Sequence, residues 1–135
     1  MLLRTLTPNL SLADQLTEQD LAEVVEQGFK TVICNRPDEE GEPHLMSSHA
    51  AELLKASGVE FYYLPVNGAA ITDLDVAEHA ALLNDAEQPV LTYCRTGTRC
   101  AKLWALASDD SADSVIQAVA STGLNIEDIR ERLNG

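Results

Sequence analysis

Hydrophobic positions along the chain recur with two different periods, and the short period marks four strands. "LSLADQL" (10–16) alternates apolar and polar residues, as a half-exposed or edge strand does. "KTVICNR" (30–36) is a β-branched run that ends before Pro37, which is typical of a buried strand. "VEFYYLPV" (59–66) and "QPVLTYC" (88–94) predict the third and fourth strands.

Between and after these strands the apolar residues follow helical spacing. Thr17 is placed to cap a helix whose apolar stripe ends before Gly28, and Thr72 is placed to cap another. The remaining signals are the stop at Gly58 and a nearly all-apolar stretch after residue 99. We therefore predict helices at 17–28, 44–57, 73–86, 100–108 and 114–121, and a last one from 126 that Asn125 caps.

Strands that alternate with helices predict a three-layer α/β fold. The expected sheet has four to five mostly parallel strands, with right-handed crossovers and helices on both faces. We expect one domain over residues 1–135, with helices of the segment 111–135 packed onto it. Ligands of such sheets bind at the carboxyl ends of the strands, and Cys94 ends the fourth predicted strand.

Composition narrows the function classes. The formal net charge of −13, from 9 basic and 22 acidic residues, argues against nucleic acid or an anionic membrane surface as a partner. No apolar run approaches the roughly 18 residues of a spanning helix, so we expect a soluble, cytoplasmic protein. Three cysteines are too few for a disulfide framework, and no spacing of Cys and His predicts a metal site or another cofactor.

The stretch "TYCRTGTRC" (92–100) carries the candidate chemistry. A strand that ends in a turn and a helix start points backbone N–H groups at one spot, where they bind an anion and stabilise a thiolate. Cys94 is therefore the candidate nucleophile, and Arg99 is placed to bind two oxygens of an oxyanion. The alternative is a structural cysteine that ends a strand beside exposed arginines. The loop that would bind substrate comprises Arg95, Thr96, Gly97 and Thr98.

"CRTGTR" resembles two known active-site loops. One is the Cys-Arg-x-Gly-x-Arg loop of rhodanese-type sulfurtransferases, and the other is the phosphate-binding loop of tyrosine and dual-specificity phosphatases. The phosphatase loop has five residues between cysteine and arginine and then Ser or Thr. Here four residues intervene, and Cys100 stands at the hydroxyl position.

The rest of the chain is similar to the phosphatase lineage. "LSLADQLTEQDLAEVVEQGFKTVICNRPDEE", "HAAELLKASGVEFYYLPV" and "LTYCRTGTRCAKLWAL" resemble the bacterial family called beta-lactamase hydrolase-like protein, phosphatase-like domain, over residues 8 to 108. The resemblance implies the fold of small cysteine phosphatases. Members are labelled hydrolase, phosphatase-like or sulfur transferase.

The general acid separates phosphate chemistry from sulfur chemistry. Hydrolysis of a phosphate monoester by a cysteine needs a proton donor for the leaving alkoxide, whereas expelled sulfite or thiolate needs little protonation. By the resemblance, the acid follows the "LPV" strand end, where Asn67 stands instead. The remaining candidate acids are Asp73, Asp75 and Asp38, each of which also fits a helix-terminal or solvated role.

We therefore expect a group-transfer enzyme with a covalent intermediate on Cys94. The favoured form is a sulfurtransferase that carries a persulfide from thiosulfate or another persulfide to a small thiol or protein acceptor. A phosphatase-like hydrolase of phosphoesters and a weakly active oxyanion-binding module are the alternatives. Cys100 is either a resolving thiol for Cys94 or a small buried residue of the helix.

Overall fold

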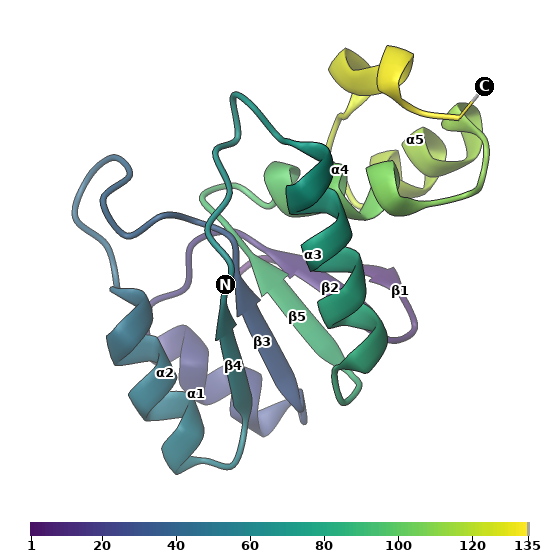
Figure 1. Cartoon of the computed structure of the whole chain (residues 1–135). Helices are drawn as coiled ribbons and strands as arrows, with labels where there is room; N and C mark the ends of the chain where they lie inside the picture. Colours follow the sequence, from purple (N-terminus) through teal and green to yellow (C-terminus); the bar gives the residue numbers. More distant parts are fainter. Residues whose placement is uncertain (135) are drawn as a thin grey trace.

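A five-stranded mixed sheet forms the centre of the molecule (Figure 1). The computed structural model describes residues 1–134, and Gly135 lies outside the described residues. The strands are β1 (Leu3–Thr7), β2 (Leu10–Ala13), β3 (Thr31–Cys34), β4 (Glu60–Tyr63) and β5 (Val90–Tyr93), in the spatial order β1-β2-β5-β3-β4. β2, β5, β3 and β4 are parallel, as predicted, and β1 is antiparallel to β2.

Strand β1 is the element that the sequence pattern did not predict. It is an edge strand whose side chains are mostly half-buried, so it lacks the continuous apolar run of a central strand. Its pairing with β2, from Leu3 opposite Ala13 to Thr7 opposite Leu10, gives it a place in the sheet. The predicted range 10–16 is correspondingly too long, because the strand ends at Ala13.

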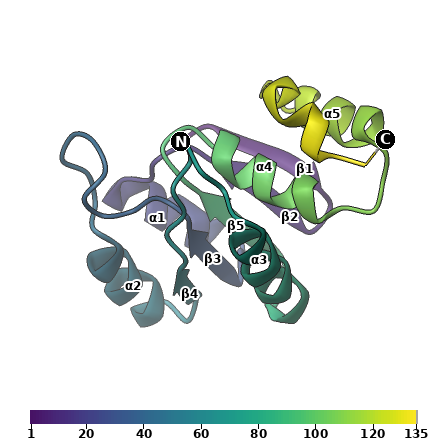
Figure 2. The same cartoon turned by 45° about the horizontal axis from the view of Figure 1, so that its top comes forward.

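Helices cover both faces of the sheet, which confirms the three-layer prediction (Figures 1 and 2). On one face, α1 and α2 pack over alternate strand residues such as Val32 and Cys34; Ile33 faces the opposite layer. The helices are α1 (Glu18–Glu26), α2 (Ser47–Ala56), α3 (Asp73–Asp85), α4 (Thr98–Ala107) and α5 (Ala112–Ala120), followed by the 3-10 helix η1 (Glu127–Arg132).

Several helix ends follow from local side-chain hydrogen bonds. Thr17 and Thr72 each form a reciprocal capping box with the acid three residues on, so both predicted caps are confirmed. The predicted last helix is a short 3-10 helix instead, in which no residue is fully buried and Ile129 packs partly buried against the neighbouring core. Val119 of α5 and the neighbouring Ile126 are fully buried in the same cluster as Leu12 and Cys100.

The parallel strands end level with one another. In the sheet register, one row across the carboxyl ends contains Ala13, Tyr93, Cys34 and Tyr63. The loops that leave this row therefore emerge side by side, at the edge where ligands of parallel sheets bind. Cys94 is the first residue beyond the row on β5.

Candidate active site

Four loops meet at this edge, one from each parallel strand. Gln15 follows β2, Asn35 follows β3, Val66 follows β4 and Cys94 follows β5. Backbone hydrogen bonds join them: Asn35 N donates to the Tyr93 carbonyl at 2.9 Å, and Val66 N donates to the Asn35 carbonyl at 3.0 Å. The site is therefore fixed by the sheet rather than by one flexible segment.

The loop from Cys94 to Gly97 curls back onto the cysteine sulfur. Gly97 has a φ of 91°, a left-handed conformation that glycine adopts readily, and it is the N-cap of α4. Its N–H donates to Cys94 Sγ at 3.1 Å. Helix α4 begins at Thr98, two residues before the predicted start, so its first N–H groups also point toward the loop.

This environment stabilises the thiolate of Cys94. The Cys100 thiol is the largest cause, followed by backbone N–H groups of the loop and the charge of Arg99; together they outweigh burial and lower the Cys94 pKa to about 6. Burial raises the pKa of Cys34 to about 11 and that of Cys100 well above its ordinary value. Cys94 is therefore the cysteine of this chain suited to act as a nucleophile near neutral pH.

Cys100 lies on the first turn of α4 and is fully buried. Its Sγ donates to Asn35 Oδ1 at 3.1 Å, and the same thiol is the largest cause of the lowered pKa of Cys94. The single proton of this thiol serves Asn35 or Cys94 at a time, and an ionised Cys94 is the stronger acceptor. All three cysteines are free, so a disulfide between Cys94 and Cys100 stays a prediction.

Arg99 projects from the first turn of α4 into the space between three loops. Its Nη1 donates to the carbonyls of Val66 at 2.9 Å and Asn35 at 3.3 Å, and its Nη2 pairs with Glu40 Oε1 at 2.7 Å. Its Nε is buried without a hydrogen-bond partner. A Cβ on Gly68 would lie 2.9 Å from this Nε, so the glycine leaves room for the guanidinium.

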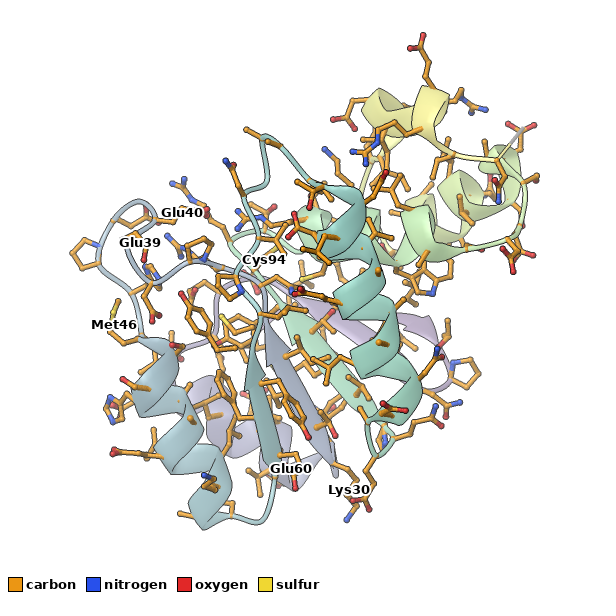
Figure 3. All side chains as sticks on the ribbon, viewed as in Figure 1. Lys30, Glu39, Glu40, Met46, Glu60 and Cys94 are labelled. Carbon is orange, nitrogen blue, oxygen red and sulfur yellow. The ribbon has the colours of Figure 1, made fainter. Side chains whose placement is uncertain are left out.

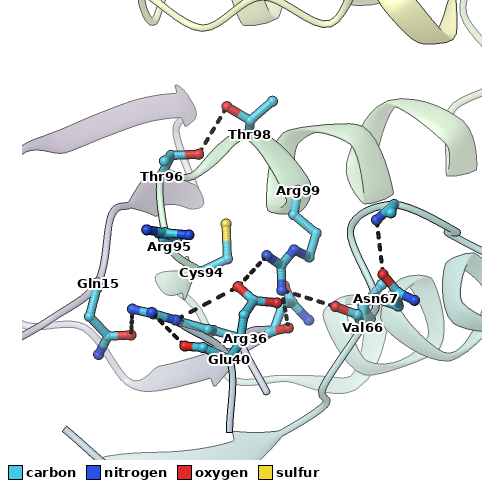
Figure 4. A network of polar contacts seen from close by, with 12 residues as sticks. Gln15, Arg36, Glu40, Val66, Asn67, Cys94, Arg95, Thr96, Thr98 and Arg99 are labelled. Atoms are coloured by element: carbon cyan, nitrogen blue, oxygen red, sulfur yellow. Dashed lines mark hydrogen bonds and ion pairs between the residues drawn. The ribbon is translucent and has the colours of Figure 1, made fainter. Parts of the chain in front are cut away.

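A chain of ion pairs continues from Arg99 across the site (Figure 4). Glu40 also lies 3.7 Å from the Nε of Arg36, whose Nη2 lies 3.8 Å from Glu42. Glu42 in turn pairs with Arg95 at 2.9 Å. Two glutamates of the loop after β3 thus hold three arginines in one alternating network.

Arg36 and the two glutamates are site residues that sequence reasoning missed. Arg36 is only 1% exposed, and it also donates to Gln15 Oε1 at 3.2 Å and to the Glu40 carbonyl at 2.7 Å. Its position was the available signal, because Arg36 is the second residue after the end of β3 and so lies at the same edge of the sheet as Cys94, which follows β5. Arg95, of the loop predicted to bind substrate, is about half exposed.

The three candidate acids have partners at helix ends, which agrees with the helix-terminal role that the sequence left open for them. Asp38 accepts hydrogen bonds from the backbone N and the Oγ of Ser47, both at 2.7 Å, and so caps α2. Asp75 forms the capping box of α3. Asp73 is fully exposed on the same turn, 3.5 Å from Arg132.

The remaining loop residues make local contacts. Asn67 turns back on its own loop, where its Oδ1 accepts from the N–H of Ala69 at 3.0 Å. Thr96 and Thr98 share a hydrogen bond at 3.3 Å on the outer side of the loop. Among residues 1–134, no group of three or more His, Cys, Asp or Glu side chains is placed to hold a metal ion. The same residues form no helix long and apolar enough to cross a membrane.

Parallel strands whose central member ends in a cysteine loop and a helix start are the arrangement of the cysteine phosphatase-like fold, here with four residues in place of five between Cys94 and Arg99. The family model for beta-lactamase hydrolase-like protein, phosphatase-like domain, matches residues 2–124. The chain belongs to this family, as its sequence resemblance implied.

Curated relatives in the family are much longer than this chain. A beta-lactamase hydrolase-like protein of Agrobacterium fabrum is 34% identical over 110 residues, which are 80% of this chain and 25% of that protein. One from Xylella fastidiosa is 28% identical over 99 residues, 73% of this chain and 23% of that protein. The chain thus spans about a quarter of the length of these relatives.

Solved structures with the same fold are named as phosphatases or as candidate phosphatases. A candidate phosphatase from Neisseria meningitidis is 38% identical, with a TM-score of 0.89, and the match covers 98% of this chain and 96% of that one. The catalytic core of the PP-IP phosphatase Siw14 from S. cerevisiae is 17% identical, with a TM-score of 0.69, covering 92% and 76%. TpbA of P. aeruginosa, solved with pTyr, is 20% identical, with a TM-score of 0.70, covering 97% and 79%.

Proposed function

We propose that the protein is a phosphatase-like hydrolase that acts through a cysteinyl-phosphate on Cys94. The observation that carries the proposal is the contact of the Cys94 sulfur with the N–H of Gly97, at 3.1 Å and next to the start of α4, in surroundings that lower the Cys94 pKa to about 6. The likeness to phosphatase structures supports phosphate as the transferred group.

The reaction divides into two displacements at phosphorus. The Cys94 thiolate forms a bond to phosphorus while the bond to the leaving oxygen breaks, and that oxygen takes the electron pair. Backbone N–H groups of the loop and Arg99 stabilise the charge on the equatorial oxygens. Water then attacks the cysteinyl-phosphate, which releases orthophosphate and regenerates the thiolate.

The contacts of the aspartates favour a particular leaving group. Asp38, Asp73 and Asp75 are each engaged at a helix end rather than with the Cys94 loop. A leaving oxygen that is stable as an anion needs no proton from the protein, so a phenolate or a phosphate leaves more readily than an alkoxide. We therefore propose a phosphate ester or anhydride with a good leaving group as the substrate.

The short spacer of the loop favours sulfur transfer as a second candidate. Four residues separate Cys94 from Arg99, and the Gly97 N–H already contacts the sulfur, so the cup is small. In that reaction the thiolate would attack the outer sulfur of thiosulfate. The S–S bond breaks, sulfite leaves with the electron pair, and Cys94 becomes a persulfide.

One experiment separates the two chemistries. Turnover of p-nitrophenyl phosphate and the intact mass after incubation with thiosulfate or glutathione persulfide are measured for the reduced protein and for Cys94→Ser. Phosphate release that requires Cys94, without a sulfur adduct, supports the hydrolase. A gain of one sulfur atom that requires Cys94, without phosphate release, overturns it in favour of sulfur transfer.

A further inference from the structure

The loop after β3 places two carboxylates against arginine side chains of the site. Glu40 Oε1 lies 2.7 Å from Arg99 Nη2, and Glu42 Oε2 lies 2.9 Å from Arg95 Nη2. Both glutamates belong to the short charged segment 37–43, and Figures 3 and 4 show Glu40 of this segment beside Cys94. In the free protein, carboxylate oxygens therefore satisfy guanidinium donors at two separate points beside Cys94.

The second of these points has the features of an anion site. The guanidinium groups of Arg36 and Arg95 converge on Gly41, whose Cβ position would lie 3.0 Å from Arg36 Nη2 and 3.6 Å from Arg95 Nη1. Arg36 is almost fully buried, and its Nη2, which donates to the Glu40 carbonyl at 2.7 Å, lies 3.8 Å from Glu42. A buried guanidinium beside an exposed one is a suitable pair of donors for a phosphate group.

A cavity of about 400 Å³ lies against this pair of arginines. It lies beside the Cys94 loop, and its lining includes Gln15, Thr17, Arg36, Glu42, His44 and Arg95. The volume admits a small organic group in addition to a phosphate. The pair with Glu42, whose side chain is 61% exposed, is of the weak and solvent-screened kind that a better-matched anion displaces.

We propose that Arg36 and Arg95 form a second anion subsite, occupied by Glu42 in the free protein, and that the substrate therefore carries two anionic groups. The first group binds the Cys94 loop, and the second displaces Glu42 from the two arginines. The inference rests on the proposed function for the first group. The proposed substrate is a small molecule with two phosphate groups, or with one phosphate and a second, separate anionic group.

Binding to the Cys94→Ser protein tests the subsite without any turnover. Calorimetric titrations compare methylphosphonate with alkane diphosphonates of increasing chain length. We expect the best-fitting diphosphonate to bind about tenfold tighter or more, since it gains charge-assisted hydrogen bonds to two guanidinium groups. Equal affinity of all the compounds overturns the subsite. Lack of binding even by methylphosphonate instead contradicts the proposed function, together with the subsite that rests on it.

Two substitutions assign the gain to the named residues. Arg95→Gln should remove most of the advantage of the diphosphonate, whereas Lys30→Gln, an equal charge change at the opposite end of the sheet, should keep it (Figure 3). Glu42→Gln should raise diphosphonate affinity about two- to fivefold, because the internal competitor is gone, and Glu60→Gln should not.

The substitutions also distinguish binding of the ligand by Arg95 from a purely structural role of its ion pair in holding the loop. If Arg95→Gln lowers the melting temperature but leaves the ratio of diphosphonate to methylphosphonate affinity unchanged, the network only holds the loop and the proposal is wrong. Because both Arg95 and Glu42 are exposed, both variants should fold, and their melting temperatures are measured alongside.

Discussion

Replacing Cys100 by alanine should raise the pKa of Cys94. The fall of that pKa from 9.0 to about 6 corresponds to about 4 kcal/mol of preference for the thiolate, and the Cys100 thiol is its largest cause. A hydrogen bond to a charged acceptor contributes about 1.5–3 kcal/mol. Losing it should therefore move the Cys94 pKa up by about one to two units, to about 7–8.

Serine at the same position is the matched control. Cys100→Ser keeps a donor of similar size at the buried position, so the Cys94 pKa should stay close to that of the unmodified protein. The two variants thus separate loss of the donor from change of the residue.

Alkylation by iodoacetamide measures the thiolate directly. The rate of mass gain is followed from about pH 5 to 9, since the thiolate is the reactive form. Cys34, with a pKa of about 11, and Cys100, whose pKa is raised well above its ordinary value, should react slowly over this range, and peptide mapping checks the site of modification. Identical profiles for the alanine variant and the unmodified protein would refute the role of the Cys100 thiol.

Three further substitutions test the surroundings of the site. Glu40→Gln removes the negative charge beside a buried guanidinium, so chemical denaturation should show a fall of about 1–3 kcal/mol in the free energy of unfolding. The exposed neighbour Glu39→Gln should lower it by less than about 0.5 kcal/mol, and equal losses for the two variants would contradict the role of Glu40. Gly68→Ala should displace the Arg99 guanidinium and lower kcat/KM for p-nitrophenyl phosphate about tenfold or more with little change in melting temperature, and unchanged kinetics would show that Arg99 has room to shift. Asp75→Ala removes a capping interaction and should cost about 1 kcal/mol of stability at constant turnover, whereas a loss of turnover would restore Asp75 as an acid.

Most of the fold could be predicted because the signals for it are local. Four strands and the caps at Thr17 and Thr72 follow from apolar periodicity and from side chains three residues apart. Strand β1 escaped prediction because its half-buried residues acquire their role only through pairing with β2. The last helix was mistaken in type, since η1 has no buried stripe to distinguish it from an exposed α-helix.

The site could be predicted only as far as one loop carries it. Cys94, Gly97 and Arg99 are close in sequence, so their joint geometry follows from a strand end and a helix start. The interaction of Glu40 with Arg99 joins residues 59 positions apart, and no local pattern encodes it. The sequence left the role of the aspartates open, because acids near a strand end fit a catalytic role and a capping role equally well until their partners are known.

The excess of acidic residues gives the arginine network a physical consequence. Three of the nine basic residues of a chain with a formal charge of −13 meet at one edge of the sheet, and two glutamates already neutralise part of their charge. An incoming anion therefore exchanges with a carboxylate instead of meeting an unpaired arginine. Displacing a carboxylate gains less free energy than binding to an unpaired arginine, so affinity should depend on how well the second anionic group of a ligand replaces Glu42 at Arg36 and Arg95. A ligand with a single anionic group on the Cys94 loop leaves Glu42 in place, which is why the proposed subsite favours a substrate with two anionic groups.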